Sequence, residues 1–304
     1  MTVTKADDGA AVAAGESLSV SSISARRRIR NRLAIGLICL AIVVAAVPLI
    51  LMMVYVLRKG ASAISWKFLT KPIPPPREKG PGMGPAVIGT IVITFWAAVM
   101  SIPLGILGAI YVTEYGARNR LARVIRFMSD VMAGVPSIIM GLFIYTAYTL
   151  KTHKLTGFGG SLALACLMLP IVIRSTEAML SLVPGDLREA SYALGTSKSR
   201  TVLTVVMPAA LPGITSGCLL AVARAAGETA PLLFTIGILQ LHSNWNAFKG
   251  SNTALSAQIF VNAQQPFAGA QQRAWGAALT LIGMVLILTI AARVVSSRFS
   301  VKAS

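Results

Sequence analysis

The chain has 304 residues, of which 55% are hydrophobic and only 12% are charged. A soluble domain usually carries about a quarter charged residues, so this composition excludes an ordinary cytosolic enzyme and a disordered chain. The net charge of +18 is typical of nucleic-acid-binding proteins, but here the charges cluster between long apolar runs, which indicates a membrane protein.

Residues 1–32 are predicted to form a cytoplasmic basic tail that is partly disordered. Small and polar residues dominate the first 25 positions, and five arginines follow between residues 26 and 32. Residues 33–57 then carry no charge, and this run of 25 residues exceeds the ~20 that a helix needs to cross a bilayer. The run and the leader before it are too long for a signal peptide, so we expect an uncleaved first transmembrane helix at 33–57.

Five more apolar segments follow, and together with the first they predict an all-α integral membrane protein with six transmembrane helices. They are Val87–Val112, Val131–Leu150, Ser161–Leu182, Ile214–Leu239 and Ala274–Ala292. We expect residues 58–86 to form an external loop rich in Pro and Gly, residues 87–296 to form a core of five helices, and residues 297–304 to form a cytoplasmic tail.

The distribution of positive charge predicts the orientation. Six spans place both termini on one side, together with the loops at 118–126 and 184–208. That side carries more Lys and Arg than the other side. The positive-inside rule therefore places both termini and both loops in the cytoplasm.

The three cysteines predict neither a disulfide framework nor a metal site. Cys39, Cys166 and Cys218 all lie in apolar stretches, their number is odd, and their spacing fits no zinc site. We expect buried, inert thiols and no bound metal.

The loop between the fourth and fifth predicted spans contains the most specific local pattern in the sequence. Asp186 is a good helix N-cap, Glu189 completes a capping box, and Gly195 occupies the position of a C′ glycine with positive φ. These residues predict a helix of about two turns, which is too short to be stable alone in water. A second helical stretch is expected from Lys198, ending at Pro208.

Apolar side chains line one face of the predicted short helix. Leu187, Ala190 and Leu194 are spaced i, i+3 and i+7. A short helix with a small apolar face suits docking into a groove of another protein, but it also fits an ordinary connector that lies on the membrane. Helix physics alone leaves both interpretations open.

Two Arg–Glu pairs interrupt the apolar spans. Arg174 and Glu177 are three residues apart in the fourth span, and Arg224 and Glu228 are four apart in the fifth, so each pair shares a helix face. Both arginines are expected near the middle of the membrane, where an unpaired charge costs between about 3 and more than 10 kcal/mol. One interpretation is that each arginine only neutralises its own glutamate.

The other interpretation is a polar path for an anion. Guanidinium is planar and always charged, and it binds oxyanions through paired hydrogen bonds. A carboxylate beside it accepts a hydrogen bond from a protonated oxyanion and repels an oxyanion without a proton. HPO₄²⁻ and H₂PO₄⁻ carry such protons and sulfate does not, so the Arg–Glu pairs suit phosphate.

A motif in the cytoplasmic loop resembles a known family. Glu189-Ala190-Ser191, three residues, Gly195, nine residues and then Val205-Val206-Met207-Pro208 is similar to the EAA motif of ABC importer permeases, with conservative departures at Ser191, Val205 and Met207. In that family this loop is the coupling helix, which fits a cleft in the ATP-binding subunit. The chain itself contains no phosphate-binding loop for ATP, so ATP and Mg²⁺ are expected on a partner subunit and no cofactor on this chain.

A second resemblance is to the permease subunits of phosphate-specific ABC importers. It extends over about residues 30–298 and is carried by Arg174–Leu180, Arg224–Leu233 and Ala133–Ser137, with a departure at Ala178. The resemblance implies a type-I permease fold with a cytoplasmic coupling helix, located in the bacterial inner membrane.

The same resemblance implies a role and a set of partners. The chain would be a transport subunit and not an enzyme, paired with a PstC-like permease, two PstB-like ATPase subunits and an external PstS-like phosphate-binding protein. Arg174, Glu177, Arg224 and Glu228 would line the phosphate path. Helix breaks are expected at Pro136, Gly227 and Pro231, because proline removes a backbone hydrogen bond and glycine loosens a helix.

Two alternatives are weighed against this interpretation. One is an ABC permease for another oxyanion or small solute, against which the Arg–Glu pairs count. The other is a membrane-embedded lipid-phosphate phosphatase, which would need a nucleophile or general base at the membrane surface. His153 and His242 fall in predicted external loops without an acidic or Ser partner at motif spacing, and this alternative leaves the loop motif unexplained.

Overall fold

The computed structural model describes residues 25–116, 119–238 and 242–299, and every regular element in these ranges is a helix. Among the described residues, five helices are long and apolar enough to cross a membrane, and a bent pair of helices makes a sixth crossing if it counts as one span. The predicted all-α membrane protein is therefore confirmed. Residues 1–24 of the predicted disordered tail lie outside the described residues.

The chain divides into two units, residues 1–55 and 56–304, and each is described by itself. In the first unit, helix α1 begins at Ala25; it ends at Ala61, within the second unit. It contains the predicted first span, and its side chains up to Tyr55 are almost all exposed within the chain. Cys39, which was predicted to be buried, is exposed on this apolar helix.

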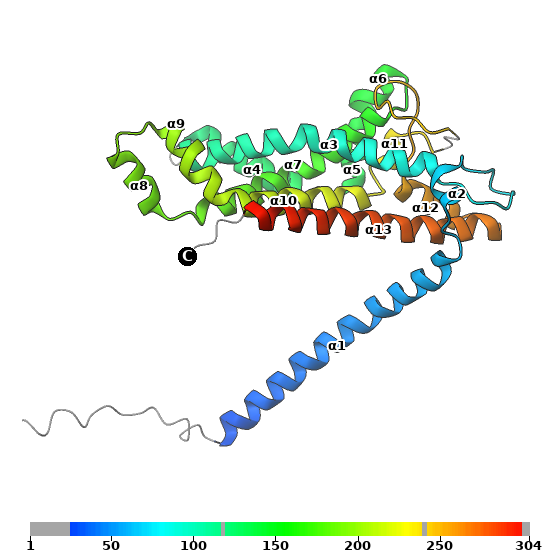
Figure 1. Cartoon of the computed structure of the whole chain (residues 1–304), viewed down its shortest axis with the longest axis horizontal. Helices are drawn as coiled ribbons and strands as arrows, with labels where there is room; N and C mark the ends of the chain where they lie inside the picture. The colour runs from blue at the N-terminus through cyan, green and yellow to red at the C-terminus, as the bar shows by residue number, and fades with distance from the viewer. Residues whose placement is uncertain (1–24, 117–118, 239–241, 300–304) are drawn as a thin grey trace, which may run out of the picture. The chain divides into compact units, whose positions relative to one another are not determined.

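Four long helices run side by side in the second unit (Figure 1). They are α3 (Gly84–Ile110), α7 (Gly157–Ser181), α10 (Met207–Gly227) and α13 (Ala268–Phe299). Helix α7 packs against α3 on one side and α10 on the other, and α10 also packs against α13. Apolar side chains from α3, α7 and α10 form the main core.

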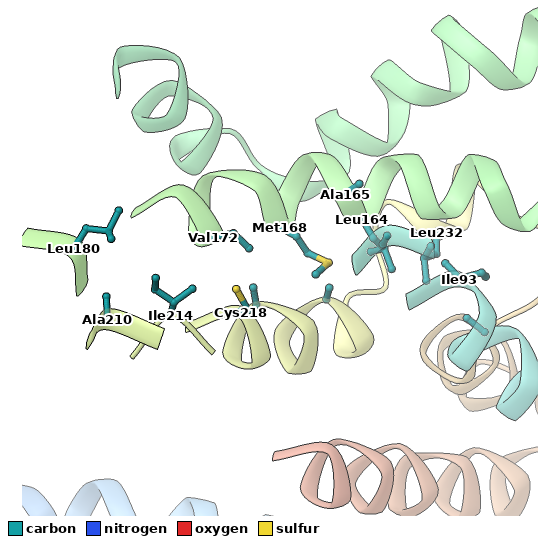
Figure 2. Packing of buried hydrophobic residues seen from close by; sticks show 14 of the residues in the cluster. Ile93, Leu164, Ala165, Met168, Val172, Leu180, Ala210, Ile214, Cys218 and Leu232 are labelled. Atoms are coloured by element: carbon teal, nitrogen blue, oxygen red, sulfur yellow. The ribbon is translucent and has the colours of Figure 1, made fainter. Parts of the chain in front are cut away.

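The α7–α10 interface sets the positions of the charged pairs. Figure 2 shows Met168 and Val172 of α7 facing Cys218 of α10 across a closely packed interface. Gly213 and Gly217 of α10 lie against Met179 and Ser175 of α7, and a Cβ at either glycine would collide with those side chains. Small residues at such positions allow transmembrane helices to approach closely.

Shorter segments cover one end of the helical body. Helix α2 (Trp66–Thr70) and helix α12 (Leu255–Ala263) lie there, at the end opposite α8 (Figure 1). The Pro-rich segment between α2 and α3 is irregular, as its composition suggests. Arg273 of α13 fastens this segment by donating hydrogen bonds to the carbonyl oxygens of Glu78 at 2.8 Å and Pro75 at 3.3 Å.

The third predicted span, Val131–Leu150, is wrong as a continuous helix. Helix α4 (Arg120–Gly134) ends before Pro136, and the chain resumes with α5 (Ser137–Ile144), the π-helix η3 (Tyr145–Thr149) and α6 (Leu150–Thr152) after a bend of 106°. The residue before a proline avoids the α conformation, and Val135 is extended with ψ 129°. Most of the predicted cytoplasmic loop at 118–126 is therefore helix α4, and residue 118 lies outside the described residues.

The fifth predicted span, Ile214–Leu239, begins earlier than predicted, and it is interrupted at the expected breaks, Gly227 and Pro231. A helical segment begins at α9 (Lys198–Thr201), continues through the π-helix η4 (Val202–Val206) and α10, and stops at Gly227. The predicted stop at Pro208 does not occur, because Pro208 lies in the first turn of α10, where a missing N–H is tolerated, and the wider π-turn precedes it. Beyond Gly227 the chain is extended at Glu228, and a short helix α11 (Leu232–Thr235) follows Pro231.

Candidate coupling and anion sites

The predicted short helix is present as α8 (Gly185–Ala193), at one end of the second unit (Figure 1). Its start differs from the prediction: Pro184 is the N-cap and no side chain caps the helix, so Asp186 lies in the first turn and the capping box with Glu189 is absent. Asp186 there complements the positive end of the helix dipole. Gly195 has φ 76°, which confirms the predicted left-handed C′ glycine.

Several apolar side chains of α8 and its C-cap are exposed within the chain. Leu187 and Tyr192 are exposed, and Leu194, which caps the helix C-terminus instead of lying inside it, is 84% exposed. Glu189 and Ala190 are exposed as well. Exposed large apolar side chains on so short a helix are typical of a surface that another protein covers.

Arg188 attaches α8 to the helical body. Its guanidinium donates to Oε1 of Glu114 at 2.8 Å, to the carbonyl oxygen of Val183 at 2.7 Å and to that of Leu180 at 3.0 Å. Glu114 belongs to the π-helix η2 (Tyr111–Tyr115) that extends α3, and its side chain is only 5% exposed. One arginine therefore joins α8 to the ends of both α3 and α7.

Three hydroxyl groups hold the turn that follows α8. Ser191 Oγ lies 2.6 Å from Thr196 Oγ1 and 2.9 Å from Thr201 Oγ1, and the two threonine oxygens are 2.9 Å apart. Ser191 is buried and stands where the family motif has its second alanine. The departure from the motif thus has a structural explanation, since the extra hydroxyl links α8 to α9.

The first Arg–Glu pair belongs to a larger network than the sequence predicted. Arg174 lies 3.4 Å from Glu177, as the spacing suggested, but helix α4 adds two partners. Arg126 Nε lies 2.6 Å from Glu177 Oε1, and Asp130 contacts Arg174 Nη2. Sequence reasoning missed both because it assigned Arg126 to a loop and began the next span after Asp130. The sequence does contain a pattern that predicts a helix here: Arg126 and Asp130 are spaced i, i+4 beside the apolar stripe of an amphipathic helix.

The second pair is looser and more open. Arg224 Nε lies 3.7 Å from Glu228 Oε1, and the Arg224 side chain is 69% exposed whereas that of Arg174 is 41% exposed. Glu228 follows the end of α10, so the pair spans a helix terminus and not the interior of a long helix.

The two arginines lie at different levels of the helical body. Continuing the antiparallel register of Gly213 with Met179 and Gly217 with Ser175 places Arg224 beside Met168, near the middle of α7. Arg174 is six residues further along α7, or about 9 Å nearer to α8. Arg174 therefore does not share the central level that the sequence suggested for both.

The structure contains the three predicted helix breaks. Pro136 separates α4 from α5, Gly227 ends α10, and Pro231 begins α11. Gly141 of α5 lies directly against the backbone of Pro231, so two broken segments contact each other.

The family model and the similar proteins identify the same family of transport proteins. Residues 101–301 match the family described as "Binding-protein-dependent transport system inner membrane component". The chain is 42% identical over 272 residues to the phosphate transport system permease protein PstA of Yersinia pestis, covering 90% of this chain and 92% of that protein. It is 41% identical over 280 residues to the phosphate transport system permease protein PstA 1 of Mycobacterium tuberculosis (strain CDC 1551 / Oshkosh), covering 90% of each.

A solved structure supports the fold independently. A chain of the MetNI methionine ABC transporter in an inward-facing conformation matches with a TM-score of 0.55 and 21% sequence identity, covering 72% of this chain and 94% of that chain. At that level of identity the match concerns the fold alone, and it confirms the predicted ABC importer permease architecture.

Proposed function

The chain belongs to the inner membrane components of binding-protein-dependent transport systems, and we propose that it is the permease subunit of an ATP-driven importer of inorganic phosphate. The observation that carries the phosphate assignment is the presence of two Arg–Glu sites on the packed α7–α10 pair, in a chain about 40% identical to phosphate transport permeases over nine-tenths of its length. The chain is a transport subunit and not an enzyme.

Arg224 and Arg174 act in sequence along the phosphate path. Arg224 is the more open guanidinium and lies level with the middle of α7, so it receives the anion first from the external side. Arg174 lies nearer to α8 and receives it next. Glu228 and Glu177 accept hydrogen bonds from the protonated oxygens of phosphate, which sulfate lacks. The arginines offset the cost of moving an anion through a region of low dielectric constant.

Helix α8 couples this chain to the ATPase. Its exposed residues Leu187, Glu189, Ala190 and Leu194 dock into the partner, with Asp186 at the rim and Gly195 setting the turn. Pro208 lies in the first turn of the helix that carries Arg224. That helix belongs to the continuous helical segment Lys198–Gly227, which the turn after α8 enters directly. ATP and Mg²⁺ bind to the partner, since this chain has no phosphate-binding loop for ATP.

The family implies an ATPase and a binding protein as partners of this multi-pass inner-membrane chain. We assign a PstC-like second permease, two PstB-like ATPase subunits and a PstS-like external protein. Both termini and α8 face the cytoplasm. Basic residues near α8 support this orientation, as does the location of the Pro-rich segment at the opposite end of the body (Figure 1).

Uptake of radiolabelled phosphate tests the proposal in a strain that lacks this gene. We expect phosphate uptake to fall, to return with the gene, and to be inhibited by excess arsenate but not by excess sulfate. Unchanged phosphate uptake in the deletion strain, or equal inhibition by sulfate, would contradict the assignment.

A further inference from the structure

Arg126, Glu177, Arg174 and Asp130 form, in that order, a chain of alternating charges between α4 and α7. Glu177 bridges the two arginines, at 2.6 Å from Arg126 and 3.4 Å from Arg174, and Asp130 contacts the far nitrogen of Arg174. Two positive and two negative side chains leave the network without net charge. An anion that reaches Arg174 therefore meets a guanidinium that is already neutralised.

The two carboxylates of the network are held very differently. Glu177 is 15% exposed and lies between two arginines, so it is fixed in place. Asp130 is 59% exposed and contacts the network through a single guanidinium nitrogen. Of the two carboxylates, Asp130 is the one that can leave Arg174 and return to it without breaking a buried contact.

The other arginine of the path has no such second carboxylate in the described part of the chain. Arg224 faces only Glu228, at 3.7 Å, and most of its side chain is exposed. The path thus contains an open guanidinium at the middle of α7 and, about 9 Å nearer to α8, a guanidinium that carries its own carboxylate ligand.

We propose that Asp130 is a tethered competitor for the transported anion at Arg174, and that its return to Arg174 promotes release toward the α8 side. This inference rests on the proposed function. Phosphate and the Asp130 carboxylate are both oxyanions that bind guanidinium through charge-assisted hydrogen bonds, so they exclude each other at the same nitrogen. A tethered carboxylate has an effective concentration in the millimolar range, which keeps phosphate from being trapped on a charge of the opposite sign.

The same exchange closes the path when no anion is present. With Asp130 on Arg174, both guanidinium groups of the network are occupied, and no unpaired positive charge attracts small anions from solution. Asp130 therefore acts on specificity and release, while Arg174 contacts the anion itself.

Asp130→Asn tests the inference, because asparagine keeps the size and loses the charge. The assay is equilibrium binding of radiolabelled inorganic phosphate to the purified full complex in nanodiscs, without the external binding protein, followed by the maximal transport rate in vesicles. An exposed ion pair is worth up to about fivefold in an equilibrium constant, so we expect phosphate to bind about two- to fivefold more tightly and the maximal rate to fall.

Two further variants keep the test decisive. Asp130→Glu retains the carboxylate and should therefore change phosphate binding and transport less than Asp130→Asn does. Glu78→Gln removes a carboxylate from the distant Pro-rich segment and should change neither quantity. Unchanged or weaker phosphate binding in Asp130→Asn would overturn the inference, even if Arg174→Gln abolishes transport as the proposed function requires. Wild-type transport in Arg174→Gln would instead refute the assigned anion path itself.

Discussion

Glu114→Gln should uncouple ATP hydrolysis from transport. The glutamine keeps the shape of the side chain but removes the charge that faces Arg188, whose Nη2 lies 2.8 Å from Glu114 Oε1. Arg188 would keep its hydrogen bonds to the carbonyl oxygens of Val183 and Leu180, so α8 would stay folded. The substitution weakens the attachment of α8 to the end of α3.

The size of the effect follows from the burial of the pair. Removing one partner of a fully buried ion pair costs about 3 to 5 kcal/mol, and a hydrogen bond to a charged group about 1.5 to 3. Glu114 is almost fully buried, but Arg188 is partly exposed and keeps two carbonyl partners, so we expect about 2 to 3 kcal/mol. That free energy shifts the equilibrium between an attached and a detached α8 by about 30- to 150-fold.

Transport and ATPase activity must be measured together on the reconstituted complex. We expect the ATPase to remain bound, because the exposed face of α8 is unchanged, and phosphate transported per ATP to fall on the order of tenfold. Glu114→Asp keeps the charge and should retain part of the coupling. If the Glu114→Gln complex transports as much phosphate per ATP hydrolysed as the wild type, the pair of Glu114 and Arg188 does not couple α8 to transport.

Three other predictions follow from the site geometry. Gly195→Val should cost about 1 to 2 kcal/mol because φ is 76°, and should reduce ATPase binding in a pull-down, whereas Gly195→Asn, which tolerates positive φ, should bind nearly normally. Arg224→Gln should abolish phosphate flux in vesicles while Glu228→Gln should admit sulfate, and equal wild-type selectivity in both would reduce the pair to a structural salt bridge. A cysteine at Lys79, which is exposed in the Pro-rich segment, should be labelled from outside intact cells and one at the exposed Ser199 should not, and the reverse pattern would invert the topology.

The length of the apolar segments was enough to locate most of the membrane helices, because crossing a bilayer imposes a minimum apolar run on any helix. Helix α8 and the positive φ of Gly195 were also predictable, since a short polar segment with a C′ glycine has few alternatives. These are local properties, in which neighbouring residues along the chain determine the outcome.

Features that depend on contacts between distant segments were not predictable. Asp130 and Glu114 acquire their partners only when α4 meets α7 and when α8 meets the end of α3, and 44 and 74 residues separate the paired side chains. A break was expected at Pro136, but the size of the bend was not: apolar composition continues through it, so hydropathy alone predicts one span where the backbone turns by 106°. A proline preceded by glycine and valine was the local warning.

ATP-driven accumulation of radiolabelled phosphate in vesicles containing the full complex tests the central claim most directly. The comparison is between the wild type and a chain carrying both Arg174→Gln and Arg224→Gln, with ATP hydrolysis measured in the same vesicles. We predict that the wild type accumulates phosphate in preference to sulfate, and that the double variant hydrolyses ATP without accumulating phosphate. Wild-type accumulation by the double variant, or equal accumulation of sulfate by the wild type, would contradict the account.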